Sequence, residues 1–591
     1  MNISTRPLYF KSGRQSLFGW LHMPEENSRT DLGVVICKPF GYEAICAHGS
    51  IRAFADACAS AGATVLRFDY TGTGDSSGTD TDADAITQWC GDIRAAMDAL
   101  REAGPVARVG LLGVRFGALL AGVVADADTS VESVIAVAPV ISGRRHLREL
   151  RAFQVTSSAE ASAAPDLAMT QNGLEVTGFR LSKDSVDHLA QLDLMRLDSR
   201  VIPSLLVLDR DDLPGASHWA EALAARGADV RYEALPGFLD MVATPHAARK
   251  PTDMLRAVAD YVSAQPRTTR LPAYPPIQHE RSESMLLTAE DGSRLVERAV
   301  YVDEGRTLFA ISTVLEAQPS GRPSHGHGVV MLNGGATSHI GPNRMYVELA
   351  RRWAARGYSV LRLDLAGLGD SATRPGENGN EVYPPGALAD VSAAIDFLRR
   401  EFAVENVTLT GLCAGAYHAL RSAISGLRVN TVLLVNPLTF YWKQGSKLSD
   451  LQDAEVMRNP GIYAEKLLSY TSWRKLMGGR VNLWRVMMIF LRRGLMTVGS
   501  SARDLSRLLK IRLPQDLGWE LQSLASRGVR IVFLFARGDV GMELLRMQGG
   551  SAVKAIGDRC RVHIIDGADH IFSQGAARNK LLQLLTSELP H

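Results

Sequence analysis

Short apolar runs recur along the chain, bounded by glycine, proline or polar residues, and this pattern is typical of buried strands. One such run, residues 407–409, precedes a helix-like segment at 417–423. Residues 92–100 and 390–398 have the apolar spacing of amphipathic helices, and each precedes a further buried strand. The fold class that we predict is therefore α/β.

The pattern occurs twice, and this repeat predicts the domain organisation. Residues 65–76 match residues 360–371 without a gap, and both stretches end in Gly-Asp-Ser. A repeat this long indicates duplicated domains, and 591 residues are too many for one core. We predict a first domain at 1–264, a linker at 265–280 and a second domain at 281–591, with contact between the two domains. The linker contains Pro266, Pro272, Pro275 and Pro276.

The most informative motif is Gly411-Leu412-Cys413-Ala414-Gly415, a glycine-flanked turn between a strand and a helix. The two glycines remove Cβ clashes from a tight bend, so the central side chain projects at the helix N-terminus, where the dipole favours an anionic sulfur. Cys413 is therefore our candidate nucleophile. The alternative interpretation is a small buried apolar residue, which most lone cysteines are.

Two further residues complete a candidate triad with Cys413. Asp539 and His570 each follow a short apolar run, so nucleophile, acid and histidine occur in the order of a Ser/Cys–acid–His triad, each just after a strand. We expect His570 to take the thiol proton and Asp539 to fix the imidazole tautomer. Asp569 is the competing acid, but an immediate neighbour of His570 is poorly placed to face its ring.

Covalent acyl chemistry also needs donors for an oxyanion. The turn at the start of the helix offers the backbone N–H of Ala414. The turn after the third strand of the second domain, residues 333–336, contains Gly335, where the backbone can approach a substrate closely. We predict Ala414 and Gly335 as the two donors. Asn333 or Thr337 could add a side-chain donor or stabilise the turn.

The first domain has lost this chemistry at the matching positions. Arg115 replaces the nucleophile, and a guanidinium is neither deprotonated near neutral pH nor nucleophilic. The acid position contains Asp212 and the histidine position contains Asp240. We expect this domain to lack triad catalysis. We also expect Arg115 to form a buried ion-pair network with the two aspartates. The alternative is an arginine that binds a substrate carboxylate or phosphate.

Both halves resemble the serine aminopeptidase-like branch of the α/β-hydrolase superfamily. The resemblance rests on residues 39–43, the two Gly-Asp-Ser stretches, the two elbows and the two acid loops. It implies two α/β-hydrolase domains in tandem, each with a mostly parallel central sheet flanked by helices. The first half also resembles hydrolase-like proteins of polysaccharide and secondary-metabolite clusters whose elbow carries arginine. Cys413 departs from the usual serine and is similar to the elbow cysteine of dienelactone hydrolases and some thioesterases and acyltransferases.

The two copies differ most at about residues 438–514, where we expect a larger helical lid on the second domain. Aromatic and methionine side chains in this stretch would cover Cys413 with apolar surface. The alternative is ordinary packing of lid helices on the body. The residues that we assign to substrate binding are Trp442, Trp473, Trp484 and Met488.

Charge is distributed unevenly behind a formal net charge of +2. Residues 1–264 contain 25 basic and 33 acidic side chains, a net of −8, which leaves +10 for residues 265–591. Residues 466–512 contain eleven Lys or Arg and one acid, Asp504. A basic lid would attract an acidic acyl carrier protein, coenzyme A or an anionic membrane, or else the acidic first domain. No nucleic-acid-binding motif is present.

Other features narrow the class of protein. The six cysteines show neither disulfide nor zinc spacing, which indicates reduced thiols and a cytoplasmic location. His325 and His327 lack further clustered ligands, so we predict no metal site and no cofactor. The N-terminus lacks the apolar core of a signal peptide, and the longest apolar stretch in the lid is far short of the ~20 residues that cross a bilayer, so no transmembrane segment is expected.

The predicted function is cysteine-dependent acyl transfer or acyl release in a biosynthetic pathway. A small-molecule thioester or ester would be the donor, and water, an amine or an alcohol the acceptor. A thiolate forms a thioester acyl-enzyme, which amines and thiols attack readily. Two alternatives stay open: a simple esterase, lactonase or peptidase-like hydrolase, and a non-catalytic binding or scaffold protein in which Cys413 is a relic.

Overall fold

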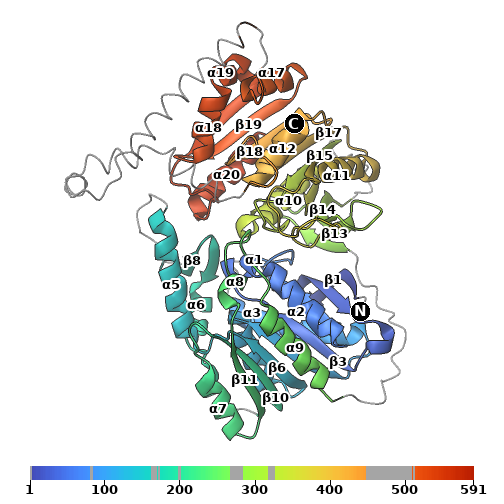
Figure 1. The fold of residues 1–591 in the computed structure, drawn as a ribbon, viewed down its shortest axis with the longest axis vertical. Coiled ribbons are helices and arrows are strands. Elements are labelled where there is room, and N and C mark those ends of the chain that lie inside the picture. The colour runs from blue at the N-terminus through green and yellow to red at the C-terminus, as the bar shows by residue number, and fades with distance from the viewer. Residues whose placement is uncertain are drawn as a thin grey trace, which may run out of the picture.

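The computed structural model describes residues 3–79, 84–160, 169–170, 173–197, 201–266, 284–316, 326–446, 507, 509 and 513–590. These residues form two α/β bodies, each built around one large sheet (Figure 1). The predicted lid at 438–514 lies mostly outside the described residues, as does most of the predicted linker.

The first sheet has eight strands in the order β1-β2-β4-β3-β5-β6-β10-β11. β1, β2 and β4 pair antiparallel, and the pairs from β4 to β11 are parallel. Helices cover both faces of the central strands, and β3 is buried along its whole length, as its continuous apolar sequence predicts. The strands are β1 (Ser4–Ser12), β2 (Gln15–Met23), β3 (Leu32–Cys37), β4 (Thr64–Phe68), β5 (Arg108–Val114), β6 (Val131–Val137), β10 (Ser204–Arg210) and β11 (Asp229–Leu235).

The helices of the first domain form two layers around this sheet. One core cluster contains α3 and α4, and another contains α2 and α9. A small sheet of β7 (Met169–Thr170), β8 (Gly173–Val176) and β9 (Phe179–Ser182) lies with α5 and α6 beside the body (Figure 1). The helices are α1 (Tyr42–Cys46), α2 (His48–Ser60), α3 (Ala85–Ala103), α4 (Phe116–Ala127), α5 (Gly143–Glu160), α6 (Lys183–Leu189), α7 (Ser217–Ala225), α8 (Phe238–Met241) and α9 (Thr252–Ala264), with short turns η1 (Glu26–Ser28) and η2 (Leu194–Arg196).

The second sheet repeats this plan with nine strands in the order β12-β13-β14-β16-β15-β17-β18-β19-β20. The first four pair antiparallel and the rest are parallel. The prediction of two tandem α/β domains with mostly parallel sheets is thus confirmed. The strands are β12 (Ser284–Thr288), β13 (Arg294–Tyr301), β14 (Phe309–Leu315), β15 (His327–Leu332), β16 (Ser359–Leu363), β17 (Asn406–Leu412), β18 (Thr431–Val435), β19 (Arg530–Ala536) and β20 (Cys560–Ile565).

Helices again cover both faces of this sheet. Side chains of α11, α12, α17 and α18 form one core cluster, and those of α10 and α20 form another. The helices are α10 (Met345–Ala355), α11 (Ala387–Phe402), α12 (Ala414–Ile424), α17 (Leu517–Ser526), α18 (Val540–Gly549), α19 (Ala552–Ile556) and α20 (Gly575–Ser587), with short turns η3 (Pro342–Arg344) and η4 (Gly557–Arg559).

The antiparallel parts of the two sheets contact each other through an apolar cluster. Trp20 of β2 packs on Phe309 of β14, with ring centroids 4.8 Å apart. Tyr9, Phe18 and Met285 complete the cluster with Ile311. These side chains come from edge-side strands of both domains, so the contact covers sheet surface that each domain alone would expose.

Buried ion pairs surround this cluster and are reciprocal between the domains. Arg67 of β4 lies 2.6 Å from Asp370, and the matching Arg362 of β16 pairs with the matching Asp75. His339 lies between the carboxylates of Asp75 at 2.7 Å and Asp364 at 2.6 Å. The repeated Arg and Asp positions therefore exchange partners across a pseudo-twofold interface.

Candidate active site

The second elbow lies at the junction of β17 and α12. Cys413 has φ 57° and ψ −114°, a backbone conformation that costs energy for any residue with a Cβ. A Cβ on Gly411 would lie 2.5 Å from the carbonyl carbon of Gly415, and one on Gly415 would lie 2.5 Å from Leu332 O. Both positions therefore require glycine, and the bend presents Cys413 at the first turn of α12.

Asp539 follows β19 and caps the N-terminus of α18. Its Oδ1 accepts a hydrogen bond from Gly541 N at 2.9 Å, and its Oδ2 lies 2.7 Å from His570 Nδ1. The Asp539 side chain is 4 % exposed, so it faces the ring from a buried and anchored position. Asp569, the competing acid, accepts from Ser573 N at 2.7 Å instead and holds the loop.

The loop that carries His570 is fixed from the sheet. Asn436, which directly follows β18, donates from Nδ2 to His570 O at 2.7 Å, and its Oδ1 accepts from Ala536 N at 2.9 Å. Asn436 is fully buried. It therefore ties the histidine loop to the end of β19, just before Asp539. Sequence reasoning missed this residue because a buried asparagine after a strand carries no signal beyond an ordinary turn.

The surroundings of His570 favour the protonated form of its ring. Burial opposes the charge, but the hydrogen bond to Asp539 and the neighbouring Cys413 outweigh it and raise the pKa of His570 well above its usual value. The second ring nitrogen, Nε2, is buried and makes no hydrogen bond of ordinary length within the described part of the chain. The geometry thus brings together Cys413, His570 and Asp539, and their catalytic roles stay a prediction.

Exposure distinguishes Cys413 from the other five cysteines. All six are free thiols, and Cys413 alone is not fully buried. Burial raises the pKa of Cys560 to about 12 and that of Cys90 to about 11. A thiol reagent is therefore expected to react at Cys413 before the others, because the thiolate is the reactive form.

The predicted oxyanion donors lie in the turns that follow two neighbouring strands, β17 and β15. Ala414 is the first residue of α12, and Gly335 lies in the turn after β15 with φ 66° and open space where a Cβ would stand. Asn333 donates to Thr337 O at 2.9 Å and to Asp364 Oδ1 at 2.7 Å. This asparagine therefore holds the turn. The oxyanion assignment of Ala414 and Gly335 stays a prediction.

Tyr346 of α10 is a further residue that the sequence did not single out. Its hydroxyl donates to Leu332 O at 3.0 Å and accepts from Leu412 N at 2.8 Å. It thereby joins the ends of β15 and β17, which carry the two predicted donor segments. In sequence it is one more apolar-face residue of a helix, so no pattern could have marked it.

An aromatic wall stands near Cys413. Trp442 stacks on Tyr383 with ring centroids 4.3 Å apart and 25° between planes, so this lid residue packs on the body. Tyr383 is 5 % exposed, and its hydroxyl has no hydrogen-bond partner among the described residues. Burial raises the pKa of Tyr383, and the neighbouring Cys413 raises it further. Trp473, Trp484 and Met488 lie outside the described residues.

The prediction that Arg115 of the first elbow pairs with Asp212 and Asp240 is wrong. Arg115 Nε lies 3.1 Å from Glu43, and Nη2 lies 2.9 Å from Glu149 of α5. Asp212 instead accepts from Arg210 Nε at 2.8 Å, and Asp240 is exposed. Arg210 is two residues from Asp212 and pairs with that carboxylate locally, whereas Arg115 pairs with the two glutamates.

Three groups of metal-ligand type meet in the described residues. His339, Asp364 and Asp370 offer atoms within 4.8 Å of one another. However, Arg67 pairs with Asp370, and His339 is shared between Asp364 and Asp75. The local cations already balance these carboxylates, which fits an interdomain ion-pair network better than a metal site.

Across the described residues, no helix combines the length and the apolar character that a membrane span requires.

Comparisons with known proteins place both halves in one superfamily. Residues 45–234 match the family model of serine aminopeptidase, S33, and residues 329–578 match that of the alpha/beta hydrolase family. No curated protein matches the chain in sequence.

Similar solved structures include Est1E from Butyrivibrio proteoclasticus with bound ferulic acid, at 17 % identity over 43 % of this chain and 96 % of that chain, with a TM-score of 0.32. Proline iminopeptidase from Mycobacterium smegmatis matches at 17 % identity over 44 % of this chain and 97 % of its own, with a TM-score of 0.29. The two family models carry the assignment: the chain belongs to the α/β-hydrolase superfamily, with a serine aminopeptidase-like domain followed in tandem by a second α/β-hydrolase domain.

Proposed function

We propose that the second domain catalyses cysteine-dependent acyl transfer or acyl release from a small-molecule thioester or ester. The observation that carries this proposal is the His570 ring, which lies 2.7 Å from Asp539 and next to the thiol of Cys413 at a strained elbow. This arrangement has the three parts that a nucleophile, a general base and an orienting acid require.

The mechanism begins when His570 takes the proton of the Cys413 thiol. The sulfur then attacks the acyl carbonyl, and the backbone N–H groups of Ala414 and Gly335 stabilise the oxyanion. Collapse of this intermediate breaks the bond to the leaving group, which receives the proton from His570. His570 next removes a proton from the acceptor, whose attack on the thioester frees Cys413. Asp539 holds the imidazole in the tautomer that both halves of the reaction use.

The acyl-enzyme is a thioester, and this favours transfer to amines, alcohols or thiols in a biosynthetic pathway as well as release to water. The basic residues at 466–512 suit an acidic acyl carrier protein or coenzyme A as the carrier of the acyl group. In this proposal the first domain is a scaffold, because Arg115 has no nucleophilic chemistry.

Intact-protein mass spectrometry with acyl thioesters of N-acetylcysteamine tests this function. We expect one added acyl group on the wild-type protein and none on Cys413→Ala. Cys560→Ala removes a buried thiol of the same domain and serves as the matched control, with labelling unchanged. Failure of every acyl thioester and ester to label Cys413 would favour the binding or scaffold alternative.

The acceptor separates transfer from hydrolysis. After acylation, candidate amines and alcohols are added, and the released product is identified. Acyl amide or ester formed in preference to free acid supports a transferase. Free acid as the sole product, at all acceptor concentrations, identifies a simple hydrolase.

A further inference from the structure

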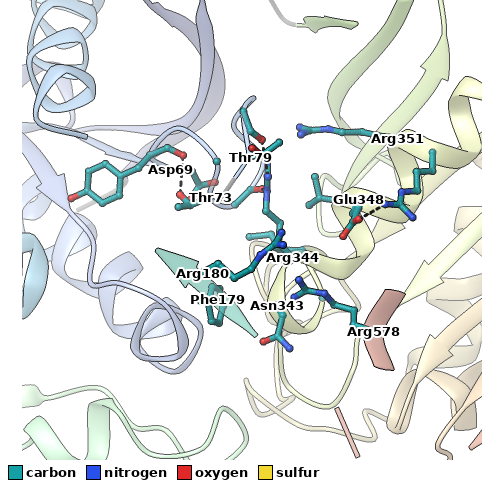
Figure 2. Close-up of a pocket in the computed structure, with 18 of the residues that line it drawn as sticks. Asp69, Thr73, Thr79, Phe179, Arg180, Asn343, Arg344, Glu348, Arg351 and Arg578 are labelled. Carbon is teal, nitrogen blue, oxygen red and sulfur yellow. Dashed lines mark hydrogen bonds and ion pairs between the residues drawn. The ribbon is translucent and has the colours of Figure 1, made fainter. Parts of the chain in front are cut away.

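A cavity of about 1060 Å³ lies between the two domains, apart from the candidate active site (Figure 2). Its wall includes residues 38–41 and Phe116 of the first domain and residues 340, 341, 343, 344 and 578 of the second. Neither Cys413 nor His570 contributes to this wall. The volume is large enough for a small organic ligand, which commonly occupies about 300–1,000 Å³.

The first-domain side of the cavity is aromatic. Phe40 contacts Trp89, Phe116 and Phe179, with ring centroids 5.8, 6.1 and 6.1 Å apart. Phe116 directly follows Arg115, so this wall belongs to the degenerate site of the first domain. Since Arg115 itself is bound by Glu43 and Glu149, the apolar part of that site is what remains open to the cavity.

The second-domain side is rich in arginine, and Figure 2 shows Arg344 and Arg578 with Asn343 there, whereas Arg180 lies beside Phe179 of the first domain. Two of the arginines hold the domains together. Arg344 donates to the carbonyls of Gly74 at 2.8 Å and Gly78 at 3.0 Å. Arg351 Nη2 donates to the carbonyl of Asp75 at 3.1 Å. These two arginines therefore have a structural role at the domain interface that does not require a ligand.

The side-chain amide of Asn343 has no such contact within the described part of the protein that would account for its position. Its side chain is 6 % exposed, and neither its Oδ1 nor its Nδ2 has a hydrogen-bond partner among the described residues. Its backbone has φ 51° and ψ 34°, in the left-handed region. Nε of Arg578, a residue 4 % exposed, also lacks a partner there. Leaving a buried polar group unpaired is unfavourable, so two such residues at one wall point to a missing partner.

The two residues are held next to each other and to Arg180. Arg578 Nη1 donates to Gly178 O at 2.7 Å, which joins α20 to the turn between β8 and β9. A Cβ on Gly178 would lie 2.5 Å from Asn343 Nδ2, so the amide packs directly on this glycine. Arg180 follows two residues later, in β9, and lines the same cavity. One small turn therefore gathers an amide and two guanidinium groups.

We propose that this cavity binds an organic anion with an aromatic or apolar body and a carboxylate or phosphate group. The body packs on the wall of Phe40, Phe116 and Phe179. The oxygens of the anionic group accept from Arg180, Asn343 and Arg578, and the buried polar atoms of Asn343 and Arg578 thereby gain the partners that they lack among the described residues. The degenerate first domain thus contributes half of a ligand site, and the second domain contributes the other half.

Isothermal titration calorimetry on the full chain tests the site with three probes that share one aromatic body. These are 1-naphthyl phosphate, 1-naphthoate and uncharged 1-naphthol. We expect at least one of the two anions to bind about tenfold more tightly than 1-naphthol, because charge-assisted hydrogen bonds add to the apolar contact. The preferred anion distinguishes phosphate from carboxylate.

Two variants locate the binding. Asn343→Asp keeps the shape and tolerates the left-handed backbone, but it adds a negative charge, so the anion should bind at least tenfold more weakly. Arg180→Gln, at a half-buried position, should also weaken the anion about tenfold, whereas Arg546→Gln on exposed α18 should have no effect. The thermal unfolding midpoint of each variant checks its fold.

Binding that persists in Cys413→Ala separates this site from the active site. The proposal is overturned if neither anion binds more tightly than 1-naphthol, or if folded Arg180→Gln binds the anions as the wild type does.

Discussion

The two elbows of this chain have nearly the same backbone and opposite chemistry. Arg115 has φ 54° and ψ −118°, and Cys413 has φ 57° and ψ −114°. In the first elbow a Cβ on Gly117 would lie 2.0 Å from Cys37 O, so glycine is required there as it is at Gly415. Yet Arg115 is held by two glutamates, whereas Cys413 faces a histidine. The close packing of the glycines preserves the bend in both elbows. Whether the elbow can carry a nucleophile depends on the central side chain and on the residues that contact it.

The largest difference should come from removing the base of the second elbow. With His570→Ala, no group remains to take the thiol proton, and we expect the rate of acylation by a thioester to fall by about 10³-fold or more. Stopped-flow measurement of thiol leaving-group release checks this. His563→Ala, at a partly exposed position of β20 in the same domain, is the control and should keep most of the rate. An unchanged acylation rate in His570→Ala would show that His570 is not the base.

Asp539→Asn should have the next effect. The amide removes the carboxylate that raises the pKa of His570 and favours the wrong tautomer, so we expect the acylation rate to fall by roughly 10²–10⁴-fold. Asp569→Asn tests the competing acid, and its rate should stay within a few-fold of wild type. If Asp569→Asn slowed acylation more than Asp539→Asn, Asp569 would be the acid of the triad.

The interface between the domains provides a pH-dependent test. Burial lowers the pKa of His339, but the carboxylates of Asp364 and Asp75 outweigh it and raise the pKa to about 10. The unfolded value is about 6.5, so the stabilisation is complete below that pH and is lost as pH rises towards about 10. At about 1.4 kcal/mol per pKa unit, this stabilisation is on the order of 5 kcal/mol.

Urea unfolding of wild type and His339→Gln at pH 6 and pH 9 measures this contribution. The variant should be destabilised most at pH 6, and the gap should narrow at pH 9. A gap that stays constant with pH would show that the charge on His339 does not contribute to the interface.

The first elbow should give the smallest effect. Arg115→Ala removes the partner of Glu43 and Glu149, both of which are partly exposed, so we expect a loss of about 1–2 kcal/mol of unfolding free energy and no change in acylation. Arg115→Cys sharpens the comparison further. It installs a thiol on the same bend without a histidine, and acylation at residue 115 should be no faster than that of free cysteine. Rapid acylation there would mean that the bend alone activates a thiol.

Local signals made much of this architecture predictable. The repeat revealed two domains, and the contact between Asp539 and His570 could be predicted because each lies in the loop after a strand. The partners of Arg115 could not be predicted, because Glu149 lies on α5, a segment without a counterpart pattern in the other half. Nor could the exchange of partners between Arg67 and Arg362 be predicted, since the same residues could pair within one domain. Asn436 and Tyr346 act through hydrogen bonds that only the folded chain brings together.

The central claim is that the sulfur of Cys413 accepts an acyl group with the help of His570. Rapid quenching of the wild-type protein with an acyl thioester, followed by peptide mass mapping, tests it most directly. The account predicts the acyl group on the peptide that contains Cys413, and its absence when His570→Ala is quenched at the same time. An acyl group found on another residue, or equal labelling of Cys413 in both proteins, would contradict it.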